Sequence, residues 1–173
     1  MKCTSLLMQD HKIILRALDV VDHMAERVAN DQPVPAEDVE TILRFLRAFA
    51  DDNHQTKEES ALFPELLRTS AANTAPLRHM IFEHDQERSL VEGLEETMRT
   101  NQGVEFVQFA GRLTSLIRTH IHKEDYILFE VADRSLTTEQ DERVTAELNR
   151  YQTKSGWLDD LRRLEWTYLR RVA

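Results

Sequence analysis

The sequence is poor in residues that interrupt or cross-link a chain, with four glycines, four prolines and one cysteine among 173 residues. The single Cys3 excludes a disulfide within the chain and a Cys-x-x-Cys metal or redox motif. Runs of β-branched residues are also missing, whereas helix-favouring Leu, Ala, Glu and Arg are abundant. The composition therefore predicts long helices and excludes a disulfide-stapled or thiolate-ligated protein.

Long hydrophobic runs are missing as well. No segment reaches the roughly 20 consecutive apolar residues that span a bilayer. Asp10 and His11 come before the apolar region of a signal peptide could form. We therefore expect a soluble protein of the cytoplasm with no membrane partner.

Basic residues are outnumbered, since 22 Lys and Arg stand against 31 Asp and Glu and give a formal net charge of −9. A protein that binds nucleic acid needs a clustered basic surface to meet the phosphate backbone. The one arginine-rich segment, "LRRLEWTYLRR" near the C-terminus, is interleaved with acidic and apolar residues. We therefore expect no nucleic-acid partner.

What the chain does contain is helical periodicity with short connections. Four long helical segments are predicted, at residues 4–30, 35–68, 76–99 and 104–133. Pro35 suits a first helical turn, and Pro64 is expected to bend or end the second helix. Because the loops are short, neighbouring helices should run antiparallel. The sequence thus predicts an all-α fold, with an up-down-up-down antiparallel four-helix bundle in residues 1–134.

Residues 135–173 are predicted to form a C-terminal helical extension. Thr137 and Gln140 fit a capping box that starts a short helix. An apolar stripe at helical spacing follows, formed by Trp157, Leu161, Leu164 and Tyr168. This stripe predicts that the extension packs on the bundle or on a partner subunit, and the second arrangement would give a homodimer.

Each predicted bundle helix carries one histidine on its apolar face, and these are His11, His54, His84 and His120. On the fourth helix, Ile127 is expected to share the buried face of His120. A single histidine on an apolar face is usually a core residue, but four at inward positions predict a shared site. The remaining three are expected at the periphery, at His23, His79 and His122.

Two carboxylates fall on the same inward faces. Glu58 follows His54 by four residues and Glu124 follows His120 by four, which places each pair on one side of its helix. A buried ionised carboxylate is costly unless it is paired or bound to a metal ion. At about 1.5 Å per residue, the two glutamates and the four inward histidines reach a similar depth in antiparallel helices. The six side chains are therefore predicted to converge.

The chain also repeats itself, and the repeat contains these residues. "HQTKEESALF" at residues 54–63 matches "HIHKEDYILF" at 120–129, and "LLMQDHKIILRAL" at 6–18 matches "HMIFEHDQERSLV" at 79–91. Two similar helical hairpins related by an approximate twofold axis would build a symmetric site. The repeat therefore predicts that two metal ions are held.

Four imidazoles and two carboxylates favour iron, with manganese or zinc as alternatives and calcium or magnesium disfavoured. If each ion takes two histidines and both carboxylates bridge, each ion has four protein ligands. An open position then remains for a small molecule. An oxo or hydroxo bridge would help to balance the buried charge.

In this order and spacing, the segments "QDHKII", "HQTKEESALFPEL", "FEHDQER" and "HIHKEDYILF" resemble the hemerythrin-like (HHE cation-binding) family over about residues 6–132. The resemblance implies a four-helix bundle with a non-haem di-iron centre. The ligand positions that it implies are the same six, His11, His54, Glu58, His84, His120 and Glu124.

The pattern departs from that of hemerythrins that carry oxygen reversibly. The pattern that those hemerythrins resemble has a His-x-x-x-His pair on the third helix. In this chain the positions four residues before and after His84 are Met80 and Arg88, so the pair is missing. The carboxylate on the fourth helix is Glu124, and the neighbouring Asp125 is offset from it. The ligand pattern is closer to the di-iron domain of iron-centre repair proteins.

The sequence leaves several functions open. The first is a di-iron protein that binds or senses O2, NO or peroxide. The second is a di-iron redox enzyme or a factor for iron-centre repair or iron handling under oxidative or nitrosative stress. The third is a metal-free helical interaction module that uses the stripe from Trp157 to Tyr168, but it leaves the inward glutamates unexplained. No nucleophile triad or phosphate-binding loop indicates another chemistry.

Overall fold

The computed structural model describes residues 2–69 and 74–169, and these residues form helices and turns without any strand, so the all-α prediction is confirmed. The elements in chain order are α1 (Cys3–Ala29), α2 (Ala36–Phe45), η1 (Leu46–Gln55), η2 (Glu58–Leu62), α3 (Phe63–Leu67), α4 (Thr74–Arg99), α5 (Gly103–Lys123), η3 (Glu124–Leu128), α6 (Phe129–Ser135), α7 (Thr138–Leu148) and α8 (Ser155–Tyr168). The segments labelled η are π-helical.

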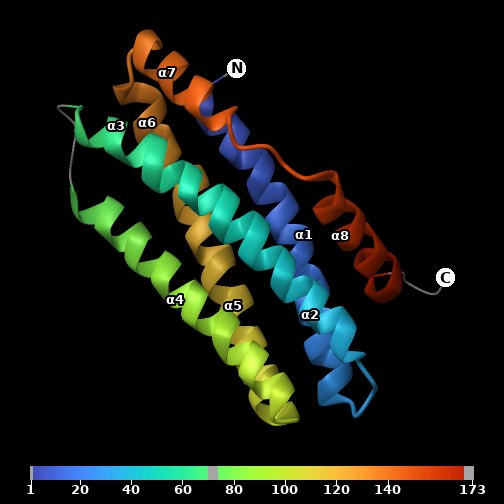
Figure 1. Ribbon diagram of the computed structural model, residues 1–173. Helices are drawn as coiled ribbons and strands as arrows, with labels where there is room; N and C mark the ends of the chain where they lie inside the picture. The colour runs from blue at the N-terminus through green and yellow to red at the C-terminus, as the bar shows by residue number, and fades with distance from the viewer. Residues whose placement is uncertain (1, 70–73, 170–173) are drawn as a thin grey trace.

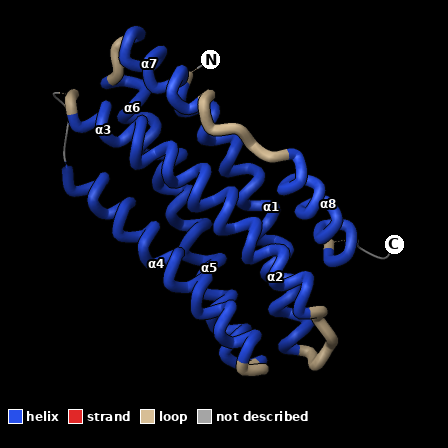
Figure 2. Tube along the Cα trace, in the orientation of Figure 1, coloured by secondary structure: helices blue, strands red, loops and turns tan. Residues whose placement is uncertain are grey.

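Several elements join end to end into long rods. α2 continues through η1 and η2 into α3, which we call the second rod, and α5 continues through η3 into α6, which we call the fourth rod. These two rods lie alongside α1 and α4, with contacts between α4 and α5, between α1 and α5, and between η1 and both α1 and α4 (Figure 1). Among the described connections, residues 30–35 join α1 to α2 and residues 100–102 join α4 to α5 as short loops (Figure 2). The inward faces of the rods therefore line one shared interior.

The turns have the residues that their backbone requires. Asp31, just after α1, and Asn101, just after α4, both have φ near 55°. Aspartate and asparagine tolerate this left-handed conformation better than other residues with a side chain. Pro35 precedes the first turn of α2, next to the predicted position. Helix ends in this protein are thus encoded locally.

The π-helical segments correct one prediction about the buried face. Ile127 is 61% exposed, whereas Leu128 is buried, so the prediction that Ile127 lies inward is wrong. Residues 124–128 form η3, and a π-helical turn contains more residues than an α-helical turn. The inward face therefore passes from His120 through Glu124 to Leu128 at intervals of four residues.

Pro64 neither ends the second rod nor starts a loop. The chain stays helical to Leu67, and Pro64 lies within the first two positions of α3, directly after η2. Because η2 leads directly into α3, the missing N–H of Pro64 removes a backbone hydrogen bond without ending the helix. The rod therefore extends more than two turns past Glu58, the last of its predicted ligands.

The apolar core is divided into two clusters along the rods. One contains Ile14 of α1 and Ile117 of α5, and the other contains Leu7 of α1 and Leu128 of η3. His11 lies between Leu7 and Ile14, so it falls between the two clusters. Apolar packing stabilises both ends of this middle layer, and the polar residues of the layer are held in place from both sides.

The C-terminal extension contains two helices in the described residues, α7 and α8. The capping box is confirmed, since Thr137 and Gln140 each accept a hydrogen bond from the other's backbone N–H, at 3.2 and 2.8 Å. α8 contacts α1 and α2, and its Leu161 and Leu164 are fully buried in the larger apolar cluster. The hydroxyl of Tyr168 donates to Asp38 of α2 at 2.8 Å. The apolar stripe thus packs on helices of its own chain.

Within residues 2–69 and 74–169, none of the helices combines the length and the apolar composition that crossing a bilayer requires.

Two glycines in the α4–α5 pair offer a matched test of this packing. A methyl group on Gly93 would overlap the ring of Phe109, whereas a methyl group on Gly111 meets no atom within 4 Å. We expect Gly111→Ala to stabilise the fold by up to about 1 kcal/mol, because alanine favours helix over glycine. Gly93→Ala should be destabilising by about 1–3 kcal/mol, because the crowded ring must shift. Urea unfolding of both variants measures the difference, and equal midpoints would contradict it.

Candidate metal centre

The middle layer of the helical body brings together all six residues that the sequence predicted as metal ligands. Each of the six is at most 3% exposed. They form two overlapping groups that share Glu58 and Glu124, and in each group one potential ligand atom per residue lies within 4.8 Å of the others. One group adds His11 and His54, and the other adds His84 and His120. The arrangement has the composition of a two-ion site with two shared carboxylates.

The first group draws on α1 and the second rod. Nε2 of His11 lies 3.3 Å from Oε2 of Glu124 and 3.9 Å from Oε1 of Glu58. Nε2 of His54 lies 3.5 Å from the same Oε1 of Glu58. Both imidazoles thus point their Nε2 atoms at the shared carboxylates.

The second group has the same form on α4 and α5. Nε2 of His84 lies 3.5 Å from Oε2 of Glu58, and Nε2 of His120 lies 3.2 Å from Oε2 of Glu124. Glu58 therefore presents one oxygen to each group, as a bridging carboxylate does. The Nε2 atoms of His84 and His120 are 3.1 Å apart. Two nitrogen lone pairs at this distance repel each other unless a proton or a cation lies between them.

Every inward imidazole has a carboxylate at its outer nitrogen. Nδ1 of His11 lies 2.6 Å from Asp125, and Nδ1 of His54 lies 3.4 Å from Asp10. In the other half, Nδ1 of His84 lies 2.6 Å from Glu59, and Nδ1 of His120 lies 2.9 Å from Glu83. A carboxylate accepts, so each Nδ1 carries the hydrogen and donates it. The Nε2 lone pair is then free to bind a metal ion, and the carboxylate makes the imidazole a stronger ligand.

Cationic side chains hold three of these outer carboxylates. Nζ of Lys57 donates to Asp10 at 2.7 Å, and Nζ of Lys123 contacts Glu83. The guanidinium of Arg88 donates to Glu59 at 3.1 Å. The lysines are equivalent in the two halves, since each follows its inward histidine by three residues. The lysine recurs in the sequence motif because each copy pairs with the carboxylate behind an inward histidine.

The phenylalanine that ends each repeated motif also has a place at the site. Phe129 stacks on His11 with ring centroids 5.5 Å apart, and Phe63 stacks on His84 at 6.2 Å. Each ring covers an imidazole that comes from another rod. Each half of the site thus has its own outer carboxylate, its own lysine and its own phenylalanine stacked on an imidazole. This agreement between the halves matches the repeat in the sequence.

The inward polar atoms have too few partners in the described part of the protein. Nε2 of His11 and both carboxylate oxygens of Glu58 and Glu124 are buried and accept or donate no hydrogen bond there. Buried groups of this kind cost free energy unless something satisfies them. Metal cations bind these same nitrogen and oxygen atoms. The residues therefore fit a pair of metal ions.

Three of the candidate ligands have raised pKa values, which favour their protonated forms. Burial lowers the pKa of His11 and His120, but their contacts with Asp125, Glu124 and Glu83 outweigh burial and raise it to about 9. Burial and the charge of Glu124 raise the pKa of Glu58 well above its usual range. In the protein alone, bound protons thus neutralise carboxylates that metal cations would otherwise neutralise.

One polar pair beside the site was not predicted. Glu87 of α4 is buried, its Oε2 accepts from Nε2 of Gln55 at 2.6 Å, and its Oε1 accepts no hydrogen bond within the described residues. Burial raises the pKa of Glu87 to about 7. Its charge acts on Glu58 and His120, so it lies close to the candidate ligands. The repeat gave no signal for it, because the matching residue of the first half is Ile14.

The three other histidines lie outside the site, in agreement with the sequence analysis. His23 and His122 are exposed. The side chain of His79 is about half exposed and its Nε2 lies 3.1 Å from Oε1 of Glu83. None of the three belongs to either group of potential ligands in the described residues.

Comparison with known proteins agrees with this geometry. Residues 4–132 match the hemerythrin HHE cation-binding domain. No curated protein proved similar to the chain. The match covers most of the chain and includes all six candidate ligands. This protein therefore belongs to the hemerythrin family of HHE cation-binding domains.

Proposed function

We propose that the chain holds a di-iron centre and uses it to bind or sense a small molecule, namely O2, NO or peroxide. The proposed ligands are His11, His54, Glu58, His84, His120 and Glu124. Their frame is an up-down-up-down four-helix bundle in residues 1–134, with residues 135–173 as an extension. The protein would act in the cytoplasm.

One observation carries the proposal. Five buried atoms of His11, Glu58 and Glu124 point into one layer without a hydrogen-bond partner among the described residues. A helical domain built only for folding would place apolar side chains there. Two cations between the shared carboxylates would satisfy these atoms at once.

The donor set favours iron, with manganese and zinc as the alternatives. Imidazole and carboxylate without thiolate suit iron, and two bridging carboxylates with two imidazoles give each ion four protein ligands. Iron commonly takes more ligands than four, so a position is left for an oxo or hydroxo bridge and for an exogenous molecule. This open position supports a role in binding small ligands.

A di-iron redox enzyme, or an iron-centre repair or iron-handling factor in oxidative or nitrosative stress, would use the same ligands. Rapid mixing of the iron(II)-loaded protein with peroxide or NO separates these roles. A single stoichiometric reaction supports binding or sensing, whereas repeated turnover with an added electron donor supports catalysis.

Metal analysis is the first test. We expect about two iron ions per chain after anaerobic reconstitution, with an absorption band of an oxo-bridged di-iron centre after oxidation. Chelation should lower the midpoint of thermal unfolding, because ions that bind only the folded state stabilise it. Less than one iron, manganese or zinc per chain would contradict the proposal.

A ligand substitution tests the proposed residues directly. His54→Ala should remove one imidazole and reduce the iron content to about one ion per chain or fewer. The matched control is His23→Ala, since His23 is exposed on α1 and should leave two ions bound. Iron content and far-ultraviolet circular dichroism measure loading and folding separately. Full loading of a folded His54→Ala protein would exclude His54 as a ligand.

The outer carboxylates should tune the metal affinity. Asp125→Asn weakens the acceptor at Nδ1 of His11, and we expect the iron affinity to fall by about 10–100-fold. Glu130→Gln is the control, because Glu130 lies nearby on α6 at an exposed position, where it pairs with Arg134 at 2.8 Å. Competition with a coloured chelator gives both affinities. Equal affinities would show that the contact with Asp125 does not support the ligand.

A further inference from the structure

The two halves of the site differ at one place beside the candidate ligands. Glu87 follows His84 by three residues, and its counterpart three residues after His11 is Ile14. Gln55 follows His54, and its counterpart after His120 is Ile121. Both isoleucines are buried in the larger apolar cluster. The fold thus accepts an apolar pair where the other half has a buried, hydrogen-bonded polar pair.

Retaining the polar pair has a cost. Oε1 of Glu87 and Oε1 of Gln55 are buried without a hydrogen-bond partner in residues 2–69 and 74–169. An apolar pair of similar size would remove this cost. The polar pair is therefore not explained by folding, since the equivalent position in the same protein is filled by isoleucines.

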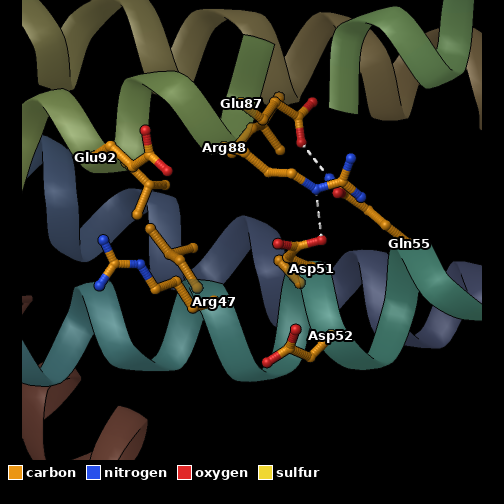
Figure 3. Close-up of a pocket in the computed structure, with 11 residues that line it drawn as sticks. Arg47, Asp51, Asp52, Gln55, Glu87, Arg88 and Glu92 are labelled. Carbon is orange, nitrogen blue, oxygen red and sulfur yellow. Dashed lines mark hydrogen bonds and ion pairs between the residues drawn. The ribbon is translucent and has the colours of Figure 1, made fainter. Parts of the chain in front are cut away.

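The polar pair lines a pocket that opens to the surface between the second rod and α4. The pocket measures about 200 Å³, and Gln55 and Glu87 form part of its wall (Figure 3). The ion pair of Arg88 with Asp51, at 2.8 Å, also lines it. Glu87 faces this pocket and also acts electrostatically on His120 and Glu58. It therefore lines the pocket and lies one helical turn from the candidate ligand His84 on α4.

We infer that this pocket is the entry route of the small molecule and that Glu87, held by Gln55, is a positioning residue for a hydroperoxide. The inference rests on the proposed function. One oxygen of Glu87 is engaged by Gln55 at 2.6 Å, and the other has no hydrogen-bond partner in the described structure. That free oxygen suits a molecule that reaches the centre with an O–H group to donate.

The chemistry selects peroxide from the proposed small molecules. Hydrogen peroxide and hydroperoxides carry O–H groups that a carboxylate can accept. O2, NO and azide at neutral pH carry no hydrogen to donate. Glu87 should therefore assist peroxide and leave azide binding nearly unaffected.

The test uses the full chain loaded with iron and exchanges the polar pair for the apolar pair of the other half. The variants are Glu87→Ile and the double variant Gln55→Ile with Glu87→Ile. The control is Glu96→Gln, at an exposed acid of α4 that does not line the pocket. Oxidation of the iron(II) protein by hydrogen peroxide is followed by stopped flow, and azide binding to the oxidised protein by absorbance. In the oxidation, one peroxide takes one electron from each of two iron(II) ions and two protons, and leaves as two waters.

We expect both isoleucine variants to react with peroxide about tenfold more slowly, as the loss of one hydrogen bond predicts. Their azide affinity should change by less than about threefold, because azide does not use that hydrogen bond. Glu96→Gln should match the parent in both assays. Unchanged peroxide rates, or equal losses for peroxide and azide, would overturn the inference.

The metal-free protein gives a readout that is independent of iron. The double isoleucine variant should unfold at the same temperature as the parent or about 2–4 °C higher, since it loses a buried unpaired carboxyl group. A lower unfolding temperature would mean that the pair has a structural role and would overturn the inference. If the parent binds no metal, the proposed function fails. If the parent binds iron and the variants behave like it, only the inference about Glu87 fails.

Discussion

Glu58 and Glu124 place four carboxylate oxygens in the interior, and Nε2 atoms of four histidines lie 3.2–3.9 Å from these oxygens. Two carboxylates so close together repel each other and cannot both be ionised in a dry core without positive charge nearby. The rest of the site answers this requirement. Imidazoles surround the carboxylates, and in the protein alone protons on His11 and His120 supply positive charge.

The charges are arranged in successive shells around this pair. Outside the imidazoles lie carboxylates such as Asp10 and Glu83, and outside these lie Lys57 and Lys123. Alternating signs let each buried group find a partner, which lowers the cost of removing it from water. Apolar clusters on both sides of the layer exclude solvent from it. The polar layer is thus specified by hydrogen bonds and the remainder of the core by packing.

The two halves of the molecule have equivalent residues in this charge network but differ in the residues next to it. Glu87 and Gln55 stand where the other half has isoleucines, and both also line a surface pocket. A buried carboxyl group without a full set of partners is a stability cost that natural domains carry where function requires it. In the function proposed here, the symmetric part of the site would hold the ions, and the asymmetric pair would select the molecule that reaches them.

Much of this protein could be predicted from the order of its residues. Apolar spacing predicted the helices, and the position of each histidine on an apolar face, with a glutamate four residues later on two helices, predicted which six side chains converge. These features are local, because helical geometry alone decides which residues share a face. The repeated lysine and the acids next to the ligands were visible, but their roles depend on contacts between different helices.

Other features were decided only when the helices packed. Ile127 turned outward because the π-helical turn at Glu124–Leu128 changed the phase of the face, and apolar spacing does not distinguish such a turn from an α-helical one. Gln55 and Glu87 are 32 residues apart and meet only because the second rod lies against α4. The sequence by itself thus determined the helices and the inward histidines and glutamates, since both follow from periodicity. The tertiary structure decided the partners of those side chains and the polar pair beside them, since contacts across helices depend on how whole faces fit together.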